Sequence, residues 1–399
     1  MDSRTGLPVV GMIGGGQLAR MTHQAAIPLG QSLRVLAVSD TDPAALVARD
    51  VVLGTHTDLD ALRAFAKGCE VVTFDHEHVP GEHLRTLVSE GVKVHPGPDA
   101  LVHAQDKLVM RRKLASLGLP VPPFAEVHEV GDVLRFGAEQ GWPCVLKAVR
   151  GGYDGRGVWM LNTPQSAQRV VPELLEAGTP LMVEQCVPMR RELAALVARS
   201  PFGQGAAWPL VQTVQSDGIC VEVLAPAPDV TPERAEAAQA LALKIADALG
   251  VVGLLAVELF ETDEGVVVNE LAMRPHNSGH WTIEGSLTSQ FEQHLRAVLD
   301  YPLGATDLVA PAVVMANVLG ASSPPAMGPD ERVHHLFARF PDAKIHLYGK
   351  AERPGRKIGH VTVLGDDMDE VRSRAKLAAH WLSDGEWLDG YDIHGGNAK

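Results

Sequence analysis

Cysteine is scarce in this 399-residue sequence, which contains four cysteines and no CxxC pair. Cys69, Cys144, Cys186 and Cys220 stand far apart along the chain. This spacing matches neither a zinc site nor a disulfide framework, so we expect neither. A reducing compartment, the cytoplasm, is therefore the expected location.

Long apolar runs and an excess of positive charge are also lacking. No run approaches the roughly 20 residues that a membrane-spanning helix needs, and the N-terminal sequence MDSRTGLP lacks the pattern of a signal peptide. The formal net charge of −14 repels nucleic acid and anionic lipid. We expect a soluble protein with no nucleic-acid or membrane partner, in which a phosphate-bearing ligand meets a local basic patch.

The composition is that of a globular protein, with 46% hydrophobic and 21% charged residues. The length predicts two or three domains. Near the N-terminus, apolar strands at 7–14, 33–40 and 70–75 alternate with helices at 18–30 and 60–69. This alternation predicts a Rossmann-like α/β domain.

The first turn of this domain carries a glycine-rich motif. Gly14, Gly16 and Ala19 match GxGxxA. Asp40 follows at about the 20-residue distance at which a dinucleotide-binding fold places its ribose acid, so an NAD-dependent dehydrogenase is one reading. The physical requirement is broader, because such glycines let a helix N-terminus approach any phosphate, and glycine turns also join strands to helices without a ligand.

Acidic residues and histidines gather where the strand at 70–75 ends, in TFDHEHVPGEH. Strand alternation places His76 and His78 on one face and Asp75 and Glu77 on the other, which disfavours a metal cluster. Ligands of open α/β sheets meet the carboxyl ends of strands. Glu77 is therefore a candidate for binding sugar hydroxyls, with a plain polar strand exit as the alternative.

A glycine-rich loop follows a proline- and glycine-rich boundary near residues 94–107. GWPCVLKAVRGGYDGRGVWML reads as a strand bearing Lys147, a loop and a second strand. The order differs from that of a Walker A loop, whose lysine follows the glycines and opens a helix. We interpret it as a hairpin that closes over phosphates, with Lys147 and Arg156 offsetting their charge. An exposed hairpin with a glycine turn is the simpler alternative.

The strand predicted next, over residues 181–187, is interrupted by Pro188. A connecting strand of this kind offers an adenine ring an apolar slot with a backbone donor and acceptor. Glu184 and Glu192 are candidates for the ribose hydroxyls. By itself this segment carries little weight.

Two glutamates lie in apolar runs on either side of a turn in AVELFETDEGVVVNE. A three-residue loop at 263–265 predicts that Phe260 pairs with Val268. It also opposes Glu258 and Glu270, with Cβ atoms roughly 5 Å apart and like charges in repulsion. A divalent cation resolves the repulsion, and Mg²⁺ prefers one or two carboxylates plus nucleotide phosphates. The hairpin therefore predicts a metal and ATP site, with two solvated glutamates on an edge strand as the alternative.

These segments together resemble the ATP-grasp superfamily. KAVRGGYDGRG, VEQCV, AVELF, VVVNELAMRPHNSGHWTIEG and HLYGKAERPGRKIGH carry the resemblance, which runs from Val9 to about Gly365. RPHNSGHWT and YGKAERPGRKIGH narrow it to the 5-(carboxyamino)imidazole ribonucleotide synthases of bacterial purine biosynthesis. The implied fold is α/β and α+β, with a Rossmann-like domain at 1–105, an ATP-grasp domain at 106–310 and a small β-rich C-terminal domain at 311–399. A glycine-rich hairpin lid is expected at about 122–186.

The resemblance also implies the reaction. Members of the family are ATP-dependent carbon–nitrogen ligases that consume ATP, bicarbonate and aminoimidazole ribonucleotide and release ADP and phosphate. ATP activates bicarbonate as carboxyphosphate, whose carbon the exocyclic amine attacks directly or after release of CO₂. ATP and Mg²⁺ are the implied cofactors, and a homodimer is the implied assembly.

The positions that match the family motifs are expected to form the site. The expected ATP-binding residues are Lys107, Lys147, Gly152, Tyr153, Asp154, Gly155, Arg156, Gly157, Glu184, Gln185, Cys186, Val187, Glu192, Gln215, Asn269 and Glu270. The expected substrate-binding residues are Gly16, Gln17, Leu18, Glu77, Tyr153, Arg274, Ser278, Lys350, Arg356 and Lys357. The expected catalytic residues are Arg274, His276 and Asn277, and the expected metal ligands are Glu258 and Glu270. Asn269 ranks lower, because an ideal strand turns it away from Glu270 unless a bulge intervenes.

The local basic patch appears in KIHLYGKAERPGRKIGH. We expect Lys350, Arg356 and Lys357 to share the ribonucleotide phosphate with amides near Gly16 and Gln17. The substrate would then bridge the N- and C-terminal domains. A solvated turn between strands is the alternative.

Some positions depart from the family pattern. Gln215 stands where a histidine is common, His78 where asparagine is usual, Met273 where proline is common and Lys107 where arginine is frequent. Other readings stay open: a formate-dependent glycinamide ribonucleotide transformylase, the NAD-dependent dehydrogenase, or a nucleotide sensor without substrate-dependent turnover. The dehydrogenase leaves the opposed glutamates unexplained.

Overall fold

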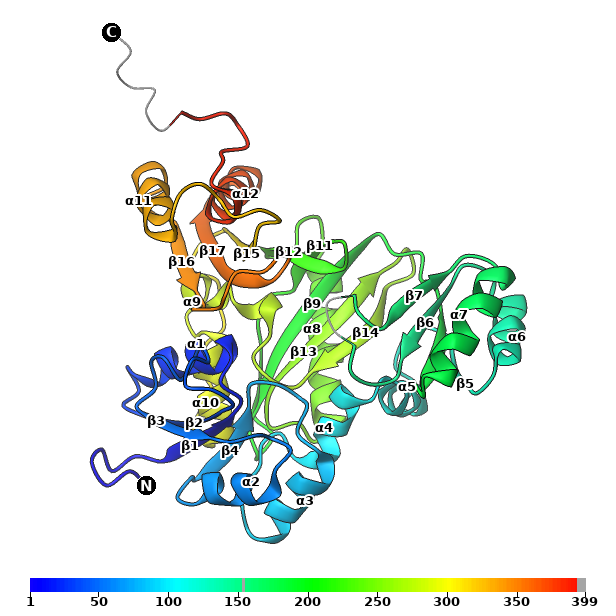
Figure 1. Ribbon diagram of the computed structural model, residues 1–399, viewed down its shortest axis with the longest axis horizontal. Helices are drawn as coiled ribbons and strands as arrows, with labels where there is room; N and C mark the ends of the chain where they lie inside the picture. The colour runs from blue at the N-terminus through cyan, green and yellow to red at the C-terminus, as the bar shows by residue number, and fades with distance from the viewer. Residues whose placement is uncertain (153–154, 393–399) are drawn as a thin grey trace.

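The computed structural model describes residues 1–152 and 155–392 and arranges them around three β-sheets. Figure 1 shows an N-terminal sheet, a central sheet and a smaller sheet that projects to one side. Within the described residues, none of the helices has the length and apolar character needed to cross a membrane.

The N-terminal sheet is parallel, with strand order β3-β2-β1-β4. Its strands are β1 (Val9–Ile13), β2 (Ser32–Ala37), β3 (Asp50–Leu53) and β4 (Val71–Phe74), and its helices are α1 (Gln17–Ala26), α2 (Leu59–Ala66) and α3 (Gly81–Ser89). The parallel order and the alternation confirm the Rossmann-like prediction. The sequence pattern misses β3, because this strand has four residues, begins with an aspartate and has no fully buried side chain.

The projecting sheet is antiparallel, and two helices pack on it (Figure 1). It consists of β5 (Phe124–Val127), β8 (Leu181–Gln185), β6 (Cys144–Ala148) and β7 (Val158–Leu161), with α6 (Val130–Gln140) and α7 (Pro164–Glu176). β6 and β7 pair with each other on either side of the glycine-rich loop, as predicted. β8 ends at Gln185, two residues before the predicted end. The chain leaves the sheet ahead of Pro188, which has no N–H to donate to a ladder.

The central sheet is antiparallel and has nine strands within the described residues. Its order is β14-β13-β9-β11-β12-β15-β17-β16, with β10 beside β9. The strands are β9 (Arg191–Arg199), β10 (Gly205–Ala207), β11 (Val211–Ser216), β12 (Ile219–Ala225), β13 (Gly253–Glu261), β14 (Val266–Ala272), β15 (Ala312–Leu319), β16 (Lys344–Leu347) and β17 (Lys357–Gly365). The C-terminal strands therefore continue the same sheet instead of forming one of their own.

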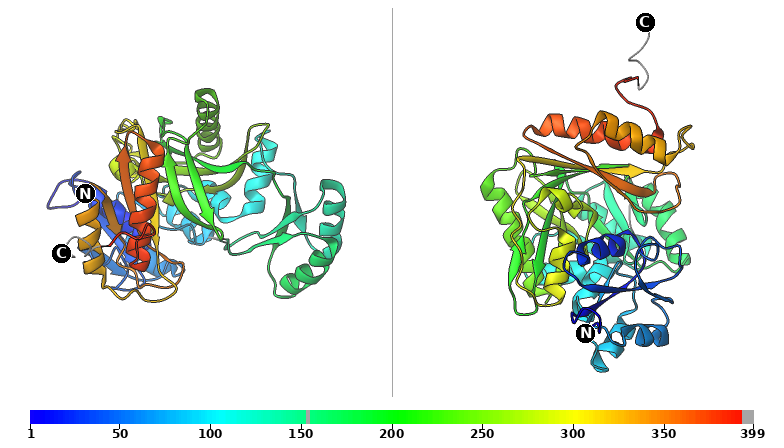
Figure 2. Two further views of the ribbon diagram at one scale, coloured as in Figure 1. Left: turned by 90° about the horizontal axis from the view of Figure 1, so that it is seen from above. Right: turned by 90° about the vertical axis from the view of Figure 1, so that its left-hand side faces the viewer.

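The remaining helices connect and cover these sheets. They are α4 (Pro98–Gln105), α5 (Lys107–Ser116), α8 (Pro232–Ala248), the 3₁₀ turn η1 (Asn277–Gly279), α9 (Thr282–Gly285), α10 (Gln290–Val298), α11 (Pro329–Arg339) and α12 (Met368–Asp384). In Figure 2, α11 and α12 lie over the C-terminal strands, while the projecting sheet stands away from the rest of the protein.

A continuous apolar core joins the N-terminal sheet to the central sheet. Phe74 belongs to the same buried cluster as Leu114 of α5 and Val257 of β13. On the other side, Leu295 of α10 is fully buried against the N-terminal sheet. This packing fixes the loops after β1 and β4 beside the end of β14, where all three border one cavity.

Candidate active site

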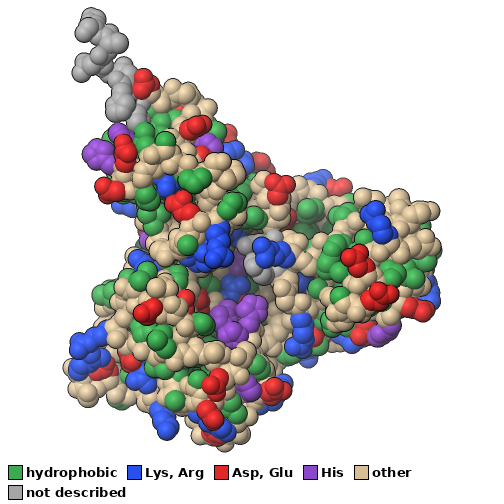
Figure 3. Space-filling view, in the orientation of Figure 1, with side chains coloured by type: hydrophobic (Ala, Val, Ile, Leu, Met, Phe, Trp, Pro, Cys, Tyr) green, Lys and Arg blue, Asp and Glu red, His purple; other side chains and the backbone are tan. Residues whose placement is uncertain are grey.

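A cavity of about 770 Å³ lies where the three sheets meet. In Figure 3 it is the hollow in which histidine and basic side chains gather. The predicted site residues that line it are Gln17, Leu18, Glu77, Lys107, Gly152, Glu258, Glu270, Arg274, His276, Asn277 and Lys357. The fold thus places residues that are far apart in the sequence around one cavity, and the volume of this cavity suits a nucleotide-sized ligand.

The opposed glutamates lie on the floor of this cavity, where β13 pairs with β14. Glu258 faces Glu270, as predicted, but Phe260 pairs with Val267 and not with Val268. The loop is one residue longer than predicted, and a β-bulge then shifts the register back by one residue. The predicted pairing nearest the turn is therefore wrong, while the pairing of the two carboxylates is confirmed.

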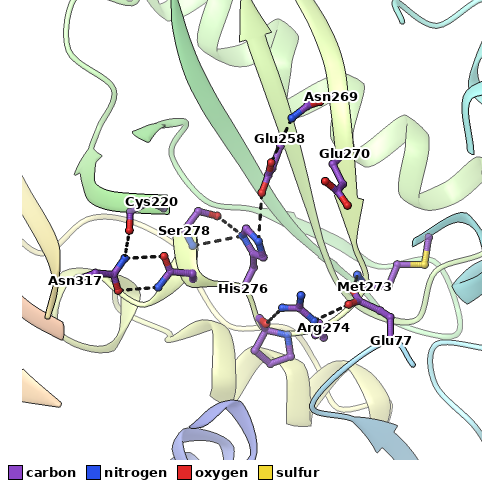
Figure 4. Close-up of polar contacts among 12 residues, drawn as sticks. Glu77, Cys220, Glu258, Asn269, Glu270, Met273, Arg274, His276, Ser278 and Asn317 are labelled. Atoms are coloured by element: carbon purple, nitrogen blue, oxygen red, sulfur yellow. Dashed lines mark hydrogen bonds and ion pairs between the residues drawn. The ribbon is translucent and has the colours of Figure 1, made fainter. Parts of the chain in front are cut away.

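Asn269 is the extra residue of this bulge, between Val268 and Glu270. The bulge turns its side chain toward the site, where Asn269 Oδ1 accepts a hydrogen bond from Lys147 Nζ at 3.2 Å. Its Nδ2 lies 3.5 Å from Glu258 Oε2 (Figure 4). An ideal strand would turn Asn269 away from Glu270, but the bulge makes the strand irregular at this position, so Asn269 is not disfavoured as a site residue.

The two glutamates have different neighbours. Lys107 Nζ donates to Glu270 Oε1 at 2.6 Å. Glu258 Oε1 lies 3.4 Å from His276 Nε2. Partial burial and then the charge of Glu270 raise the pKa of Glu258 to about 7. Glu270 thus has a cationic partner at hydrogen-bond distance, whereas the raised pKa of Glu258 indicates that its charge is less well compensated.

A divalent cation between the two carboxylates would compensate the charge of Glu258. Within residues 1–152 and 155–392 no group of three or more histidine, cysteine or acidic side chains could hold a metal ion. The two carboxylates alone make an incomplete coordination shell. Mg²⁺ commonly completes such a shell with water and nucleotide phosphates, so the donor set present suits a metal that arrives with a polyphosphate.

A buried ion-pair network lies beside the carboxylates. Glu184 of β8 accepts from Arg111 Nε at 2.5 Å through Oε1, and its Oε2 lies 2.7 Å from Lys147 Nζ. Burial favours the neutral acid, but the charges of Lys147 and Arg111 outweigh it, so the pKa of Glu184 lies below its ordinary value. Both carboxylate oxygens of Glu184 are therefore engaged by cations, and the side chain is not placed to receive a ribose hydroxyl in this arrangement.

The same network leaves positive charge at Lys147. Two cations face the single carboxylate of Glu184, and burial lowers the pKa of Lys147 despite that carboxylate. An arriving phosphate would stabilise the charged ammonium. Arg111 is not among the predicted site residues, and its only signal in the sequence is the run of basic residues in KLVMRRK.

Arg274 and His276 follow β14 and border the cavity (Figure 4). Arg274 Nε donates to Glu77 Oε2 at 2.7 Å, and the amide of Met273 donates to Glu77 Oε1 at 3.0 Å. Glu77 thus links the end of β4 to the end of β14. His276 Nδ1 lies 2.9 Å from Ser278 Oγ. Burial and then the charge of Arg274 lower the pKa of His276 to about 3, so this imidazole is neutral at neutral pH.

Asn277 is held in a reciprocal amide pair. Its Nδ2 donates to Asn317 Oδ1 at 3.0 Å, and Asn317 Nδ2 donates back to Asn277 Oδ1 at 2.8 Å. Asn317 also donates to the carbonyl of Cys220 (Figure 4). The pair ties the turn after β14 to β15 and β12. Asn317 is not among the residues predicted from the sequence.

The N-terminus of α1 is occupied by an internal carboxylate. Asp75 accepts from the amide of Gly16 at 2.5 Å and from the amide of Ala19 at 3.1 Å. A Cβ at position 16 would lie 2.3 Å from Asp75 Oδ2, which explains the glycine. The amide of Gly16 is therefore taken, whereas Gln17 and Leu18 border the cavity. Asp75 fills the place where a dinucleotide-binding fold puts its pyrophosphate.

Part of the predicted basic patch lies near this helix end. Lys357, at the start of β17, lines the cavity. The charge of Lys350 acts on Asp75, which places it near the N-terminus of α1. Arg356 Nη1 donates to the carbonyl of Ala351, within the loop before β17. Two of the three basic residues thus approach the N-terminal sheet from the C-terminal strands.

Arg150, Gly151 and Gly152, at the start of the glycine-rich loop, border the cavity. Gly155 and Gly157 have positive φ values of 74°, which favour glycine. A Cβ on Gly155 would lie 3.4 Å from Gly218, so the loop approaches the turn between β11 and β12. Arg156 lies in this loop, and the predicted residues Tyr153 and Asp154 fall outside the described residues.

The remaining predicted ATP-binding residues follow the projecting sheet into the central one. Gln185 ends β8, and Cys186 and Val187 lie in the connection that follows it. Glu192 of β9 is hydrogen-bonded by Gln215, and burial raises the pKa of Glu192. Gln215 therefore contacts another of the predicted ATP-binding residues.

The histidines after β4 form a small cluster. The rings of His76 and His78 stack with centroids 5.3 Å apart, which confirms that they share a face. His56 meets His76 edge-on at 4.6 Å. His76 and His78 line the cavity, and burial lowers the pKa of His76 to about 3.

Comparison with known protein families gives three matches along the chain. A ribonucleotide synthetase preATP-grasp domain matches residues 7–105, an ATP-grasp domain matches 112–291, and a phosphoribosylaminoimidazole carboxylase C-terminal domain matches 313–374. The three matches follow the order of the predicted domains.

Known proteins are similar over nearly the whole chain. The N5-carboxyaminoimidazole ribonucleotide synthase of Mycobacterium tuberculosis is 65% identical over 388 residues, covering 97% of this chain and 90% of that protein. The crystal structure of the Thermus thermophilus synthetase is 38% identical, with a TM-score of 0.84 over 95% of this chain and 99% of that one. The Aspergillus clavatus synthase in complex with ADP and 5-aminoimidazole ribonucleotide is 34% identical, with a TM-score of 0.84 over 94% and 98%.

The pH dependence of the free energy of unfolding tests the raised pKa of Glu258. The pKa of Glu258 is raised from 4.5 to about 7, so its contribution to stability is fully present below about pH 4.5 and is lost as the pH rises through about 7. In metal-free buffer, the free energy of unfolding of the wild type relative to Glu258→Gln should therefore fall by about 2 kcal/mol between pH 5 and 8. Urea unfolding across this range measures it.

Glu264→Gln is the matched control, because Glu264 lies exposed in the turn of the same hairpin. Its difference from the wild type should not change with pH. A constant difference between the wild type and Glu258→Gln would contradict the raised pKa.

Proposed function

The chain belongs to the family of N5-carboxyaminoimidazole ribonucleotide synthases, and from this we propose that its site carboxylates the exocyclic amine of 5-aminoimidazole ribonucleotide with ATP and bicarbonate. It is an ATP-dependent ligase of purine biosynthesis with an ATP-grasp fold. The observation that supports the site most directly is the opposition of Glu258 and Glu270 beside Lys147.

The charges of the site suit a metal-bound triphosphate. We propose that Glu258 and Glu270 hold Mg²⁺, whose role when bound is to neutralise phosphate charge. Lys107 and Lys147 would face the phosphates, and the loop from Gly152 to Gly157 would cover them. Phosphoryl transfer asks a protein mainly for positioning and charge stabilisation, which these side chains supply.

Two steps then account for the reaction. An oxygen of bicarbonate attacks the γ-phosphorus, ADP leaves and carboxyphosphate forms. The amine of the ribonucleotide attacks the carbon of carboxyphosphate, or of CO₂ released from it; phosphate leaves and the amine loses a proton. We assign Arg274 to the anionic oxygens of carboxyphosphate. His276, which is neutral, and Asn277, which is fixed by Asn317, would orient bicarbonate or the imidazole.

The ribonucleotide phosphate is assigned to the opposite wall. Lys357 lines the cavity there, together with Gln17 and Leu18 at the N-terminus of α1, and Lys350 lies near the same helix end. A phosphate monoester would be attracted by these cations and by a helix N-terminus. Arg356 is assigned to the same phosphate from its place in the loop before β17.

Three expectations go beyond the family assignment. We propose Mg²⁺ as the metal, a homodimer as the assembly and the cytoplasm as the compartment. The first is supported by the two facing carboxylates, the second by the family resemblance, and the third by the four widely spaced cysteines. The boundaries at residues 105/106 and 310/311 likewise stay a prediction, supported by matched ranges that leave residues 106–111 and 292–312 unassigned.

Substrate-dependent ADP formation tests the proposed reaction. The wild type with Mg²⁺ should form ADP only when both bicarbonate and 5-aminoimidazole ribonucleotide are present, and Glu270→Gln should lower this rate at least about 100-fold, because one charge facing the metal is lost. A coupled assay for ADP measures both rates. Glu264→Gln, exposed in the same hairpin, should keep the wild-type rate. ADP formation that requires formate and not bicarbonate would favour the transformylase alternative.

Substitution of the basic patch tests where the ribonucleotide binds. In the double variant Lys350→Ala, Arg356→Ala, KM for the ribonucleotide should rise at least about tenfold while KM for ATP changes less than about twofold, because only the monophosphate loses its counter-charges. Steady-state kinetics with each substrate varied give the two values. Lys344→Ala, exposed at the start of β16, serves as the control. Equal increases in both KM values would place the patch elsewhere.

A further inference from the structure

One buried arginine connects the two halves of the nucleotide site without lining the cavity. Arg111 on α5 has 1% of its side chain exposed. Its Nε donates to Glu184 of β8 at 2.5 Å, and its Nη2 donates to the backbone carbonyl of Asn269 in β14 at 2.6 Å. A single guanidinium thus bridges the projecting sheet and the central sheet.

The second of these contacts falls on the β-bulge. The ladder pairs Leu259 with Val268 and Glu258 with Glu270, which leaves Asn269 without a partner on β13. A partly buried carbonyl outside the ladder needs another donor. Arg111 supplies that donor, and so stabilises the one irregularity that brings Glu258 opposite Glu270.

The position of Arg111 on its helix ties this contact to the metal ligands. Lys107 and Arg111 are four residues apart on α5 and so lie on one face of the helix. Lys107 donates to Glu270, the residue directly after Asn269. Two cations on one helix therefore contact two successive residues of β14, one through a side chain and one through the backbone.

We propose that Arg111 is a positioning residue: it holds the bulge at Asn269 and, through Glu184, orients Lys147, so that the paired carboxylates and the phosphate-facing lysine keep their relative places. The inference rests on the proposed nucleotide and metal site. Lysine cannot replace it, because one ammonium on a flexible stem does not reach two acceptors in the fixed directions of a guanidinium.

A simpler role for Arg111 is to neutralise the buried charge of Glu184. Removing one partner of a buried ion pair leaves the other uncompensated, which by itself destabilises a protein. The two roles differ in the double variant Arg111→Met, Glu184→Gln. Glu184→Gln alone is the reference, because it already removes the carboxylate that Lys147 contacts. If Arg111 only neutralises Glu184, the double variant behaves like Glu184→Gln; if Arg111 holds the bulge, the double variant binds Mg²⁺-ADP less selectively than Glu184→Gln.

The test measures ADP binding by isothermal titration calorimetry, with and without Mg²⁺, in the full-length chain. The readout is the ratio of the Kd without Mg²⁺ to the Kd with Mg²⁺, because a general loss of packing does not alter this ratio selectively. Arg111→Met should reduce the ratio at least about tenfold, and the ratio of the double variant should lie below that of Glu184→Gln alone. Arg112→Met is the matched control, since Arg112 is the next residue of α5 and pairs at the surface with Glu126; its ratio should equal that of the wild type.

Arg111→Lys covers the case in which Arg111→Met does not fold. It keeps a positive charge for Glu184 and loses the second contact, so its thermal unfolding should stay close to that of the wild type while the Mg²⁺ ratio falls. A wild-type ratio in Arg111→Lys, or equal ratios in the double variant and in Glu184→Gln alone, would overturn the proposal. The measurement uses neither bicarbonate nor ribonucleotide, so failure of the proposed reaction and failure of the positioning role are distinguishable.

Discussion

Like charges forced together across a β-ribbon are the constraint on which this site depends. Glu258 and Glu270 face each other beside a cavity, and partial burial together with their mutual repulsion raises the pKa of Glu258. An arrangement of this kind is unfavourable for the protein alone and becomes favourable when a cation enters. The repulsion between the two carboxylates in the folded chain therefore favours the binding of a cation between them.

The surroundings of the pair complement it. Beside the carboxylates, Arg111 and Lys147 share the single charge of Glu184. The two carboxylates therefore have an excess of negative charge, and the neighbouring network has an excess of positive charge. A polyphosphate that carries a divalent cation satisfies both, whereas neither ion does so alone.

The arrangement of the three sheets brings these charged side chains together in one site. Glu77 joins the end of β4 to Arg274 after β14, and Asn317 of β15 fixes Asn277. Asp75 occupies two amides at the N-terminus of α1, so the glycine motif there packs around an internal carboxylate. The motif that suggested a dinucleotide therefore has a structural explanation, and Gln17 and Leu18 of the same helix border the cavity.

The sequence by itself determined the Rossmann-like alternation, the hairpin that carries the glycine-rich loop and the opposition of the two glutamates, because apolar periodicity and turn residues are local signals. It did not determine the register near the turn, where a longer loop and a bulge shift the pairing in opposite directions. Nor did it reveal Arg111, Asn317 or the role of Glu184 as a partner of cations, because each acts through a residue at least 37 positions away along the chain, the separation of Lys147 and Glu184. Such partners become neighbours only when the sheets pack, since a buried charge takes its partner from whatever the tertiary structure places within hydrogen-bond reach.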